Sequence, residues 1–200
     1  MNEISKLSGP PQQPKRLGFF IDGRNEERDD LEFLPRSSPG YGVDVTHVAL
    51  GTAADVDKAV AAARRVFDHG SWSRMPGADR ARILVKAAAL IRERAEDLAY
   101  WETLEAGKPI SQSRAEINDG AGHYEYCAGL AQTLHGQTFN TYGDDLFGLV
   151  IREPVGVVGL INPWNFPFIV LSERVPYILA SGNSVVVKPS EMTSYTTLAM

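Results

Sequence analysis

One stretch decides the fold of this chain: EPVGVVGLINPWNFPFIVLSERVPYILASGNSVVVKPSE, residues 153–191. Residues 155–161 form a short apolar run, which is typical of a strand buried on both faces. Residues 168–180 carry apolar side chains at helical spacing, and Gly182 and Asn183 supply the stop signal. A second β-branched run, SVVVK, follows directly. Strand, helix and strand in this order predict a βαβ unit with two parallel strands.

Polar side chains follow both predicted strands. The residues after the first strand are Asn162–Asn165, and those after the second are Lys188–Glu191. Parallel strands end on the same edge of a sheet, and open α/β sheets bind ligands beyond that edge. Pro163 restricts the backbone before Trp164 and Asn165, so this loop can hold an amide in place. We therefore expect an amide, an ammonium and a carboxylate to converge on one rim.

The motif EPVGVVGxINPWNFP, followed by ASGNSVVVKPSE, resembles the NAD(P)-dependent aldehyde dehydrogenase superfamily. The resemblance continues with weaker identity back to about Phe20, through FIDGR, DRARIL and LEAGKP. It implies an α/β fold: the start of an open parallel, Rossmann-like sheet covered by helices, with a β-hairpin arm. It also implies that residues 1–200 correspond to only the N-terminal portion of such an enzyme.

Asn165 is the candidate catalytic residue. In the resembled family the matching asparagine donates its side-chain N–H to the oxyanion that forms when a thiolate attacks an aldehyde, and a fixed amide suits that task. The alternative is a turn or capping asparagine, which is common at such positions. The intact PWNFP motif favours the catalytic interpretation.

Lys188 and Glu191 are the candidate cofactor residues at the second strand. The resemblance implies that Lys188 bonds the adenosine ribose of the dinucleotide. Glu191 beside it would accept ribose hydroxyls of NAD and repel the 2′-phosphate of NADP, so NAD is the expected cofactor. The alternatives are a lysine that reaches solvent and an acid at a helix start.

The resemblance further implies that the backbone of Ile161, Asn162 and Trp164 touches the cofactor. No GxGxxG motif follows the first strand, so the conventional dinucleotide fingerprint is absent from the sequence. Gly156 and Gly159 lie within the strand and are interpreted as packing positions.

Composition limits the class of protein. The chain has 200 residues, is 44% hydrophobic and 22% charged, and carries a net charge of −5, which is ordinary for a globular protein and disfavours nucleic acid as a partner. No apolar run reaches the length of a membrane span, and the N-terminus lacks the apolar core of a signal peptide. A single cysteine fits a cytoplasmic location. The histidines have no ligand set around them, so no metal site is predicted.

Four segments are expected along the chain. Residues 1–17 are polar and proline-containing and are predicted to be a disordered lead-in. Residues 18–135, with helices expected after Thr52 and through most of 79–134, would be the N-terminal part of the dinucleotide-binding domain. Residues 136–152 predict a β-hairpin that the resemblance identifies as an oligomerisation arm. Residues 153–200 would be the βαβ part of the dinucleotide-binding domain.

The family's catalytic cysteine and glutamate belong to segments of Gly-Gln-x-Cys and Glu-Leu-Gly-Gly-Lys type, and neither occurs in the sequence. Cys127 is rejected as a nucleophile, because it lies in a predicted helix without a basic neighbour. The chain is therefore expected to be part of an enzyme that oxidises an aldehyde to a carboxylic acid, and to be inactive alone. The alternative is a noncatalytic module that binds nucleotide or joins another subunit through residues 136–152.

Overall fold

The computed structural model describes residues 9–26, 28–141 and 143–200. The helices are α1 (Ala53–His69), the short 3-10 helix η2 (Trp72–Arg74), α2 (Gly77–Glu93), α3 (Ala95–Ala106), α4 (Ile110–Thr133), α5 (Pro167–Ser172), α6 (Val175–Ala180) and α7 (Tyr195–Leu198). The strands are β1 (Lys15–Leu17), β2 (Phe20–Ile21), β3 (Arg24–Asn25), β4 (Phe33–Ser37), β5 (Asp44–Ala49), β6 (Gln137–Phe139), β7 (Gly148–Val150), β8 (Val157–Ile161) and β9 (Ser184–Lys188).

The predicted βαβ unit is confirmed. Strands β8 and β9 pair in parallel, from Val157 opposite Ser184 to Ile161 opposite Lys188. Helices α5 and α6 connect the two strands. Both carboxyl ends therefore lie on the same edge, as the predicted α/β fold requires.

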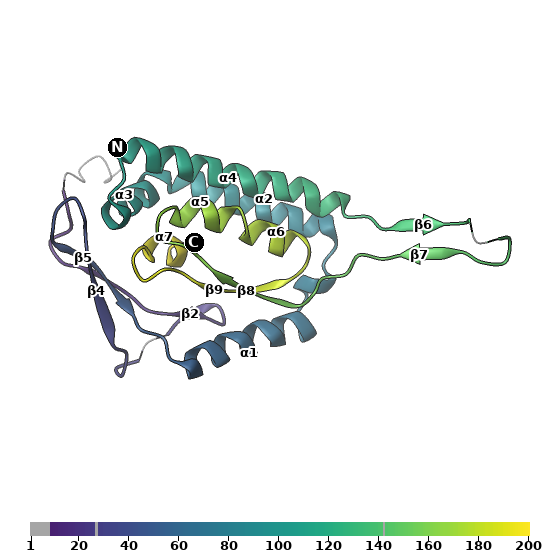
Figure 1. Ribbon diagram of the computed structural model, residues 1–200, viewed down its shortest axis with the longest axis horizontal. Coiled ribbons are helices and arrows are strands. Elements are labelled where there is room, and N and C mark those ends of the chain that lie inside the picture. The colour runs from purple at the N-terminus through teal and green to yellow at the C-terminus, as the bar shows by residue number, and fades with distance from the viewer. Residues whose placement is uncertain (1–8, 27, 142) are drawn as a thin grey trace.

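Helices cover both faces of the β8–β9 pair. Helix α1 packs on one face, and α5 and α6 lie on the other, with α4 and α2 stacked beyond them (Figure 1). The main core lies in this helical layer. Its largest fully buried side chains are Leu84, Leu98, Ile117, Phe168 and Leu171.

Two details of the βαβ prediction are wrong. The strands are not buried on both faces: Ile161 of β8 is 80% exposed. The reason is that this sheet has two strands among the described residues, so neighbouring strands do not cover it. The predicted single helix is broken between Ser172 and Val175. Pro176 lies in the first turn of α6. It lacks a backbone N–H, and its ring would clash with the carbonyl of Ser172, so α5 cannot run on through it.

The N-terminal region forms a sheet that composition did not predict. Strand β1 pairs in parallel with β5, and β4 pairs with β5 in antiparallel fashion. The predicted disordered lead-in is therefore wrong for Lys15–Leu17, because Leu17 enters a second core with Val45, Trp101 and Tyr195. Residues 1–8 of that lead-in lie outside the described residues.

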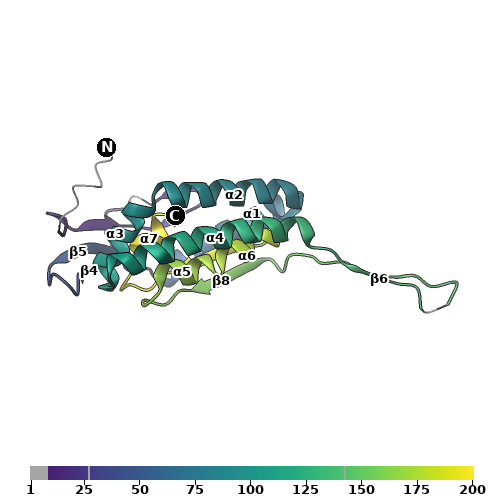
Figure 2. The same cartoon turned by 90° about the horizontal axis from the view of Figure 1, so that it is seen from above.

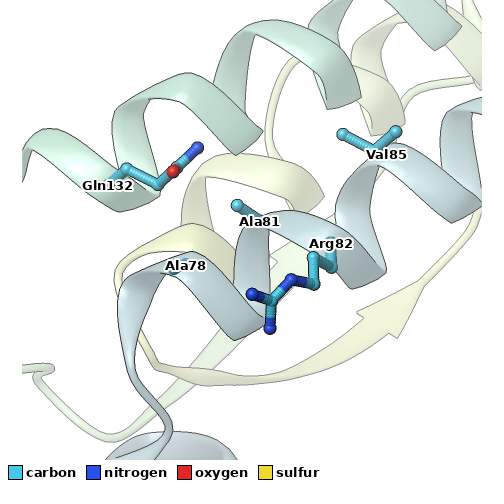
Figure 3. Close-up of a pocket in the computed structure, with 5 residues that line it drawn as sticks. All are labelled: Ala78, Ala81, Arg82, Val85 and Gln132. Atoms are coloured by element: carbon cyan, nitrogen blue, oxygen red, sulfur yellow. The ribbon is translucent and has the colours of Figure 1, made fainter.

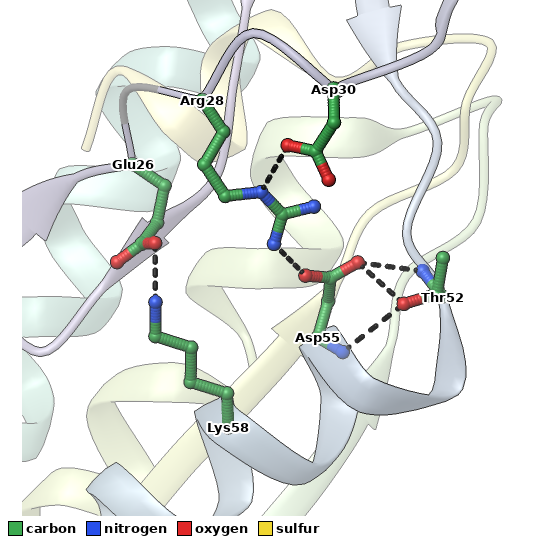
Figure 4. Close-up of polar contacts among 6 residues, drawn as sticks. All are labelled: Glu26, Arg28, Asp30, Thr52, Asp55 and Lys58. Carbon is green, nitrogen blue, oxygen red and sulfur yellow. Dashed lines mark hydrogen bonds and ion pairs between the residues drawn. The ribbon is translucent and has the colours of Figure 1, made fainter.

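Polar contacts fasten the N-terminal segment to the start of α1 (Figure 4). Thr52 and Asp55 form a capping box at the start of α1, in which each side chain accepts from the other residue's backbone N–H. Asp55 also pairs with Arg28 at 2.5 Å. The backbone N–H of Thr52, its hydroxyl and then Arg28 lower the pKa of Asp55 to about 2. A second ion pair joins Lys58 to Glu26.

The predicted hairpin is also present. Strands β6 and β7 pair antiparallel, with Gln137 opposite Val150 and Phe139 opposite Gly148. Figures 1 and 2 show it extending away from the helical layer. Tyr142, which belongs to this predicted segment, lies outside the described residues. None of the helices in the described part of the chain combines the length and apolar character needed to cross a membrane.

Candidate functional site

The two polar loops meet at the carboxyl edge of β8 and β9. The backbone N–H of Asn162 donates to the carbonyl of Lys188 at 3.0 Å, which extends the pairing one residue past the strands. The hydroxyl of Thr193, beyond the second loop, donates to the carbonyl of Trp164 at 3.1 Å. These contacts bring the 162–166 loop and the 188–193 loop into one rim, as the sequence predicted.

Asn162 closes the first loop from within. Its side chain is 3% exposed, and its Nδ2 donates to the carbonyl of Pro167 at 2.6 Å. This contact joins the end of β8 to the first residue of α5. Asn165 lies on the closed loop between these two points.

Asn165 is exposed on this rim. The N-cap of α5 is Phe166, and no side chain caps that helix. Within the described residues, the Asn165 side chain makes no hydrogen bond, so its amide is not used by the fold. The capping alternative for Asn165 therefore finds no contact in its favour.

Lys188 and Glu191 form an exposed pair at the same rim. Their Nζ and Oε2 atoms lie 3.2 Å apart, and their side chains are 62% and 50% exposed. A hydrogen bond from its own backbone N–H, and then Lys188, lower the pKa of Glu191. Helix α7 begins at Tyr195, so Glu191 is not an acid of its first turn.

Ile161 and Trp164 complete the set of predicted cofactor residues. Their side chains are 80% and 58% exposed, on either side of the buried Asn162. A Cβ built on Gly159 meets no atom within 4 Å, so the packing interpretation of this glycine is not supported by the described residues. The rim is thus open and presents exposed apolar side chains, the Asn165 amide and the Lys188–Glu191 ion pair.

A buried charge cluster lies beneath this rim, and sequence reasoning missed it. The Nζ of Lys108 lies 3.0 Å from Glu102 Oε1 and 2.6 Å from Glu116 Oε2, and the Lys108 side chain is only 8% exposed. The same ammonium lies 4.7 Å from the centroid of the Phe166 ring. Burial, and then the hydrogen bond with Glu116, raise the pKa of Glu102. The signal in the sequence was weak: Glu102 and Glu116 share the buried sides of α3 and α4 with apolar residues such as Trp101 and Ile117.

Another buried carboxyl group, that of Glu105, supports the end of the other loop. It accepts from the hydroxyl of Thr46 at 2.6 Å and from the backbone N–H of Tyr195 at 2.9 Å. Arg36 donates to the carbonyls of Glu105 and Met192. Burial raises the pKa of Glu105 to about 7. Strand β5, helix α3 and helix α7 are joined here, directly after Lys188–Glu191.

Two hollows of the surface lie away from the rim. One of about 300 Å³ lies between α2 and α4, and Figure 3 shows Ala78, Ala81, Arg82 and Val85 on α2 and Gln132 on α4 around it. Its one charged residue already pairs with Asp79. A hollow of about 590 Å³ in the N-terminal region includes Glu26 and Arg28, both paired in the network of Figure 4.

Cys127 is inside the protein rather than at the rim. It is fully buried in α4, and burial raises the pKa of its thiol to about 11. A thiol in this state is a poor nucleophile. Among residues 9–26, 28–141 and 143–200, no group of three His, Cys, Asp or Glu side chains comes together as metal ligands.

Fold and rim together define an α/β protein in which two polar loops meet at the carboxyl ends of parallel strands. The family model described as "Aldehyde dehydrogenase family" matches residues 26–200. The chain belongs to the aldehyde dehydrogenase family.

Solved structures agree with this assignment. The crystal structure of an NAD-dependent aldehyde dehydrogenase from Sinorhizobium meliloti has 51% identity and a TM-score of 0.91, over 94% of this chain and 38% of that one. The betaine aldehyde dehydrogenase of Staphylococcus aureus, solved in complex with NAD+, has 36% identity and a TM-score of 0.86, over 90% of this chain and 36% of that one.

A curated relative gives the same result. Betaine aldehyde dehydrogenase of Bacillus subtilis (strain 168) is 40% identical over 180 residues, which are 90% of this chain and 37% of the relative. The chain thus spans little more than a third of the length of these relatives. It corresponds to an N-terminal portion of the family's fold.

Proposed function

We propose that this chain supplies the oxyanion-stabilising amide and part of the NAD-binding rim of an NAD-dependent aldehyde dehydrogenase, which oxidises an aldehyde to a carboxylic acid. The observation that carries the proposal is the parallel register of β8 and β9, with Asn162 bonded to Lys188 at 3.0 Å. This register sets the PWN loop beside the KPSE loop. In this assignment residues 18–135 and 153–200 belong to the dinucleotide-binding domain, and residues 136–152 form the arm.

Asn165 would act on the carbonyl oxygen of the aldehyde. When a thiolate adds to the aldehyde carbon, negative charge develops on that oxygen, and an amide N–H aimed at it lowers the barrier. An amide that the fold leaves unbonded needs no partner to be displaced before it can donate. The nucleophile itself is not assigned to any residue of the sequence, and Cys127 is excluded by its burial.

Residues of the rim fit the adenosine ribose of NAD. The Lys188 ammonium can donate to a ribose hydroxyl, and the Glu191 carboxylate can accept from one. Their side chains are 62% and 50% exposed, so a ligand can reach both. A dinucleotide bound here would supply the acceptor for the hydride that leaves the substrate carbon. A 2′-phosphate would meet the Glu191 charge, so NAD is favoured over NADP.

The kinetic test uses the protein expressed from its complete gene and a panel of aliphatic, aromatic and amino aldehydes with NAD. We expect Asn165→Ala to lower kcat by about 10²–10³-fold, the effect of losing one oxyanion donor. The matched control is Asn118→Ala, an exposed asparagine of α4 that bonds only its own helix. Absence of NAD-dependent oxidation across the panel, or equal rates for the wild type and Asn165→Ala, would refute the proposal.

Cofactor choice is tested separately by calorimetric titration with NAD and with NADP. We expect tighter binding of NAD, and a gain in NADP affinity for Glu191→Gln because the repelling charge is removed. Equal NADP affinity of the wild type and Glu191→Gln would overturn the role given to Glu191.

A second role, subunit interaction, is favoured by the β6–β7 arm. Its apolar side chains include Phe147 at 64%, Leu149 at 62% and Ile151 at 75% exposed. Exposed apolar strands with free edges are sites for pairing with another chain. We propose that the arm pairs with a second copy of this protein.

The arm is tested by the native mass of the chain in solution. We expect a mass above 21.9 kDa for the wild type, and a shift to 21.9 kDa for the variant Leu149→Arg/Ile151→Arg. The control is Val85→Arg, at an apolar position on α2 that is 51% exposed. A monomeric wild type would contradict this role.

The cellular location is a separate proposal. A single buried cysteine favours the cytoplasm, and cell fractionation checks this location.

A further inference from the structure

Lys108 is aimed at the underside of the rim by the turn between α3 and α4. Gly107 ends α3 in the left-handed conformation, with φ of 73°, and Pro109 precedes the first residue of α4. Glycine adopts this left-handed conformation easily, whereas residues with a side chain rarely do. A Cβ at position 107 would also lie only 3.0 Å from the Pro39 side chain. The turn therefore fixes the backbone from which the Lys108 side chain extends.

Two carboxylates hold the Lys108 ammonium inside the protein. Glu102 is fully buried and lies 3.0 Å away, and Glu116 lies 2.6 Å away. Gln112 donates to the other oxygen of Glu116 at 2.8 Å, which fixes that carboxylate in turn. A lysine held in this way has one placement, unlike a lysine in water.

The ammonium faces the ring of Phe166 at 4.7 Å from its centroid. Phe166 is the residue after Asn165, and Trp164 before it is bonded through its carbonyl to Thr193. Asn162 and Pro167 close the loop at its two ends. The Phe166 residue is 39% exposed, and its ring is an anchor of this loop that depends on a charged group, because a cation over an aromatic face is attracted to the ring.

We propose that Lys108 is a positioning residue: held by Glu102 and Glu116, its ammonium fixes the Phe166 ring and so sets the direction of the Asn165 amide at the rim. This inference rests on the proposed catalytic role of Asn165. It explains why a charged cluster lies in the protein interior under an exposed loop. An apolar residue at position 108 would fill the space without holding the ring face.

The decisive variant is Phe166→Leu, which removes the ring and leaves Lys108 with both carboxylates. Phe166→Tyr keeps the ring, and Phe20→Leu is the matched control at an exposed phenylalanine of β2. These variants avoid the unpaired buried charges that Lys108→Met would leave. Thermal unfolding of each variant verifies that the fold is kept.

The first readout is NMR of the 200-residue chain, which needs no activity. We expect the ε-methylene protons of Lys108 to be shifted by the Phe166 ring current in the wild type and Phe166→Tyr, and not in Phe166→Leu. The Asn165 side-chain amide, assigned by its loss in Asn165→Asp, should be one sharp pair in the wild type and broadened in Phe166→Leu. An unshifted Lys108 signal in the wild type, or an unchanged amide pair, would overturn the proposal.

The second readout is a double-mutant cycle in the protein expressed from its complete gene. We expect Phe166→Leu to lower kcat by roughly tenfold without changing the KM for NAD, since small misplacements of catalytic groups are costly. In the Asn165→Ala background, Phe166→Leu should lower kcat no further. In the otherwise wild-type protein, Phe166→Tyr should keep the wild-type kcat, because it keeps the ring. Additive losses would mean that the ring acts elsewhere, and would end the proposal. If no variant and no wild type oxidised an aldehyde, the proposed function would fail, and the NMR result alone would decide the positioning role.

Discussion

Two lysine and glutamate sites of this chain use the same residue types in opposite ways. Lys108 meets Glu102 and Glu116 inside the protein, with side-chain exposures of 8%, 0% and 10%. Lys188 meets Glu191 on the rim, with exposures of 62% and 50%. Buried charges must satisfy one another, whereas exposed charges can exchange their partner for water or a ligand. The first site therefore serves the structure beneath the loop, and the second leaves both charges accessible from solvent.

The largest effect is expected for Lys108→Met. Removing the ammonium leaves the buried carboxyl groups of Glu102 and Glu116 without the cation that they share, and breaking a buried pair costs about 3–5 kcal/mol. Urea denaturation followed by circular dichroism measures the loss. Lys86→Met, an exposed lysine of α2, is the control and should change the free energy of unfolding by less than about 0.5 kcal/mol. Equal stability of the two variants would break the comparison between buried and exposed sites.

The buried carboxyls should also make stability depend on pH. Burial raises the pKa of Glu102 in the folded chain above its ordinary value of 4.5, and raises the pKa of Glu105 from 4.5 to about 7. For each group, at pH values between 4.5 and its raised pKa, the folded state binds more protons than the unfolded state. Stability that is present at low pH is therefore lost as the pH rises. Each group contributes at most about 1.4 kcal/mol per pH unit.

The check is the free energy of unfolding of the wild type and Glu102→Gln between pH 5 and pH 8. The amide cannot ionise, so the variant should lose less stability as pH rises. Parallel curves for the two proteins would show that Glu102 is already ionised throughout the range, against its burial.

Two glycines of α4 sharpen the same contrast between inside and outside. A Cβ on Gly120 would lie 2.5 Å from the Phe168 ring, whereas one on Gly122 meets nothing within 4 Å. Gly120→Ala should destabilise the chain by about 1–3 kcal/mol through overpacking. Gly122→Ala should stabilise it by up to about 1 kcal/mol through helix propensity. Thermal unfolding of both variants measures the sign, and equal signs would contradict the packing.

The smallest effect on stability is expected for Lys188→Ala. An exposed ion pair contributes about 0–1 kcal/mol, so the free energy of unfolding should hardly change. Affinity for NAD should nevertheless fall by roughly tenfold, the cost of one charge-assisted hydrogen bond at an exposed site. Calorimetric titration with NAD measures this loss. A stability loss like that of Lys108→Met would erase the distinction between the two sites.

Local patterns were sufficient for the elements that carry the rim. Strand β8, strand β9 and the capping box of α1 follow from β-branched runs, prolines and the Thr52–Asp55 spacing, all of which act within a few residues. The same holds for the β6–β7 hairpin and its acidic turn. Pro176 was also a local signal for the break between α5 and α6, but the apolar spacing on both sides outweighed it.

Contacts between distant segments were beyond the reach of those patterns. Strand β1 looks like a polar lead-in until Leu17 is placed against Trp101 and Tyr195, and Gly120 looks like a weak point of α4 until Phe168 packs on it. The sequence by itself determined the parallel unit and the residues at its edge, because these depend on short-range backbone preferences. Only the tertiary structure decided that Lys108 lies under Phe166, because that contact joins segments whose separation along the chain leaves no periodic trace.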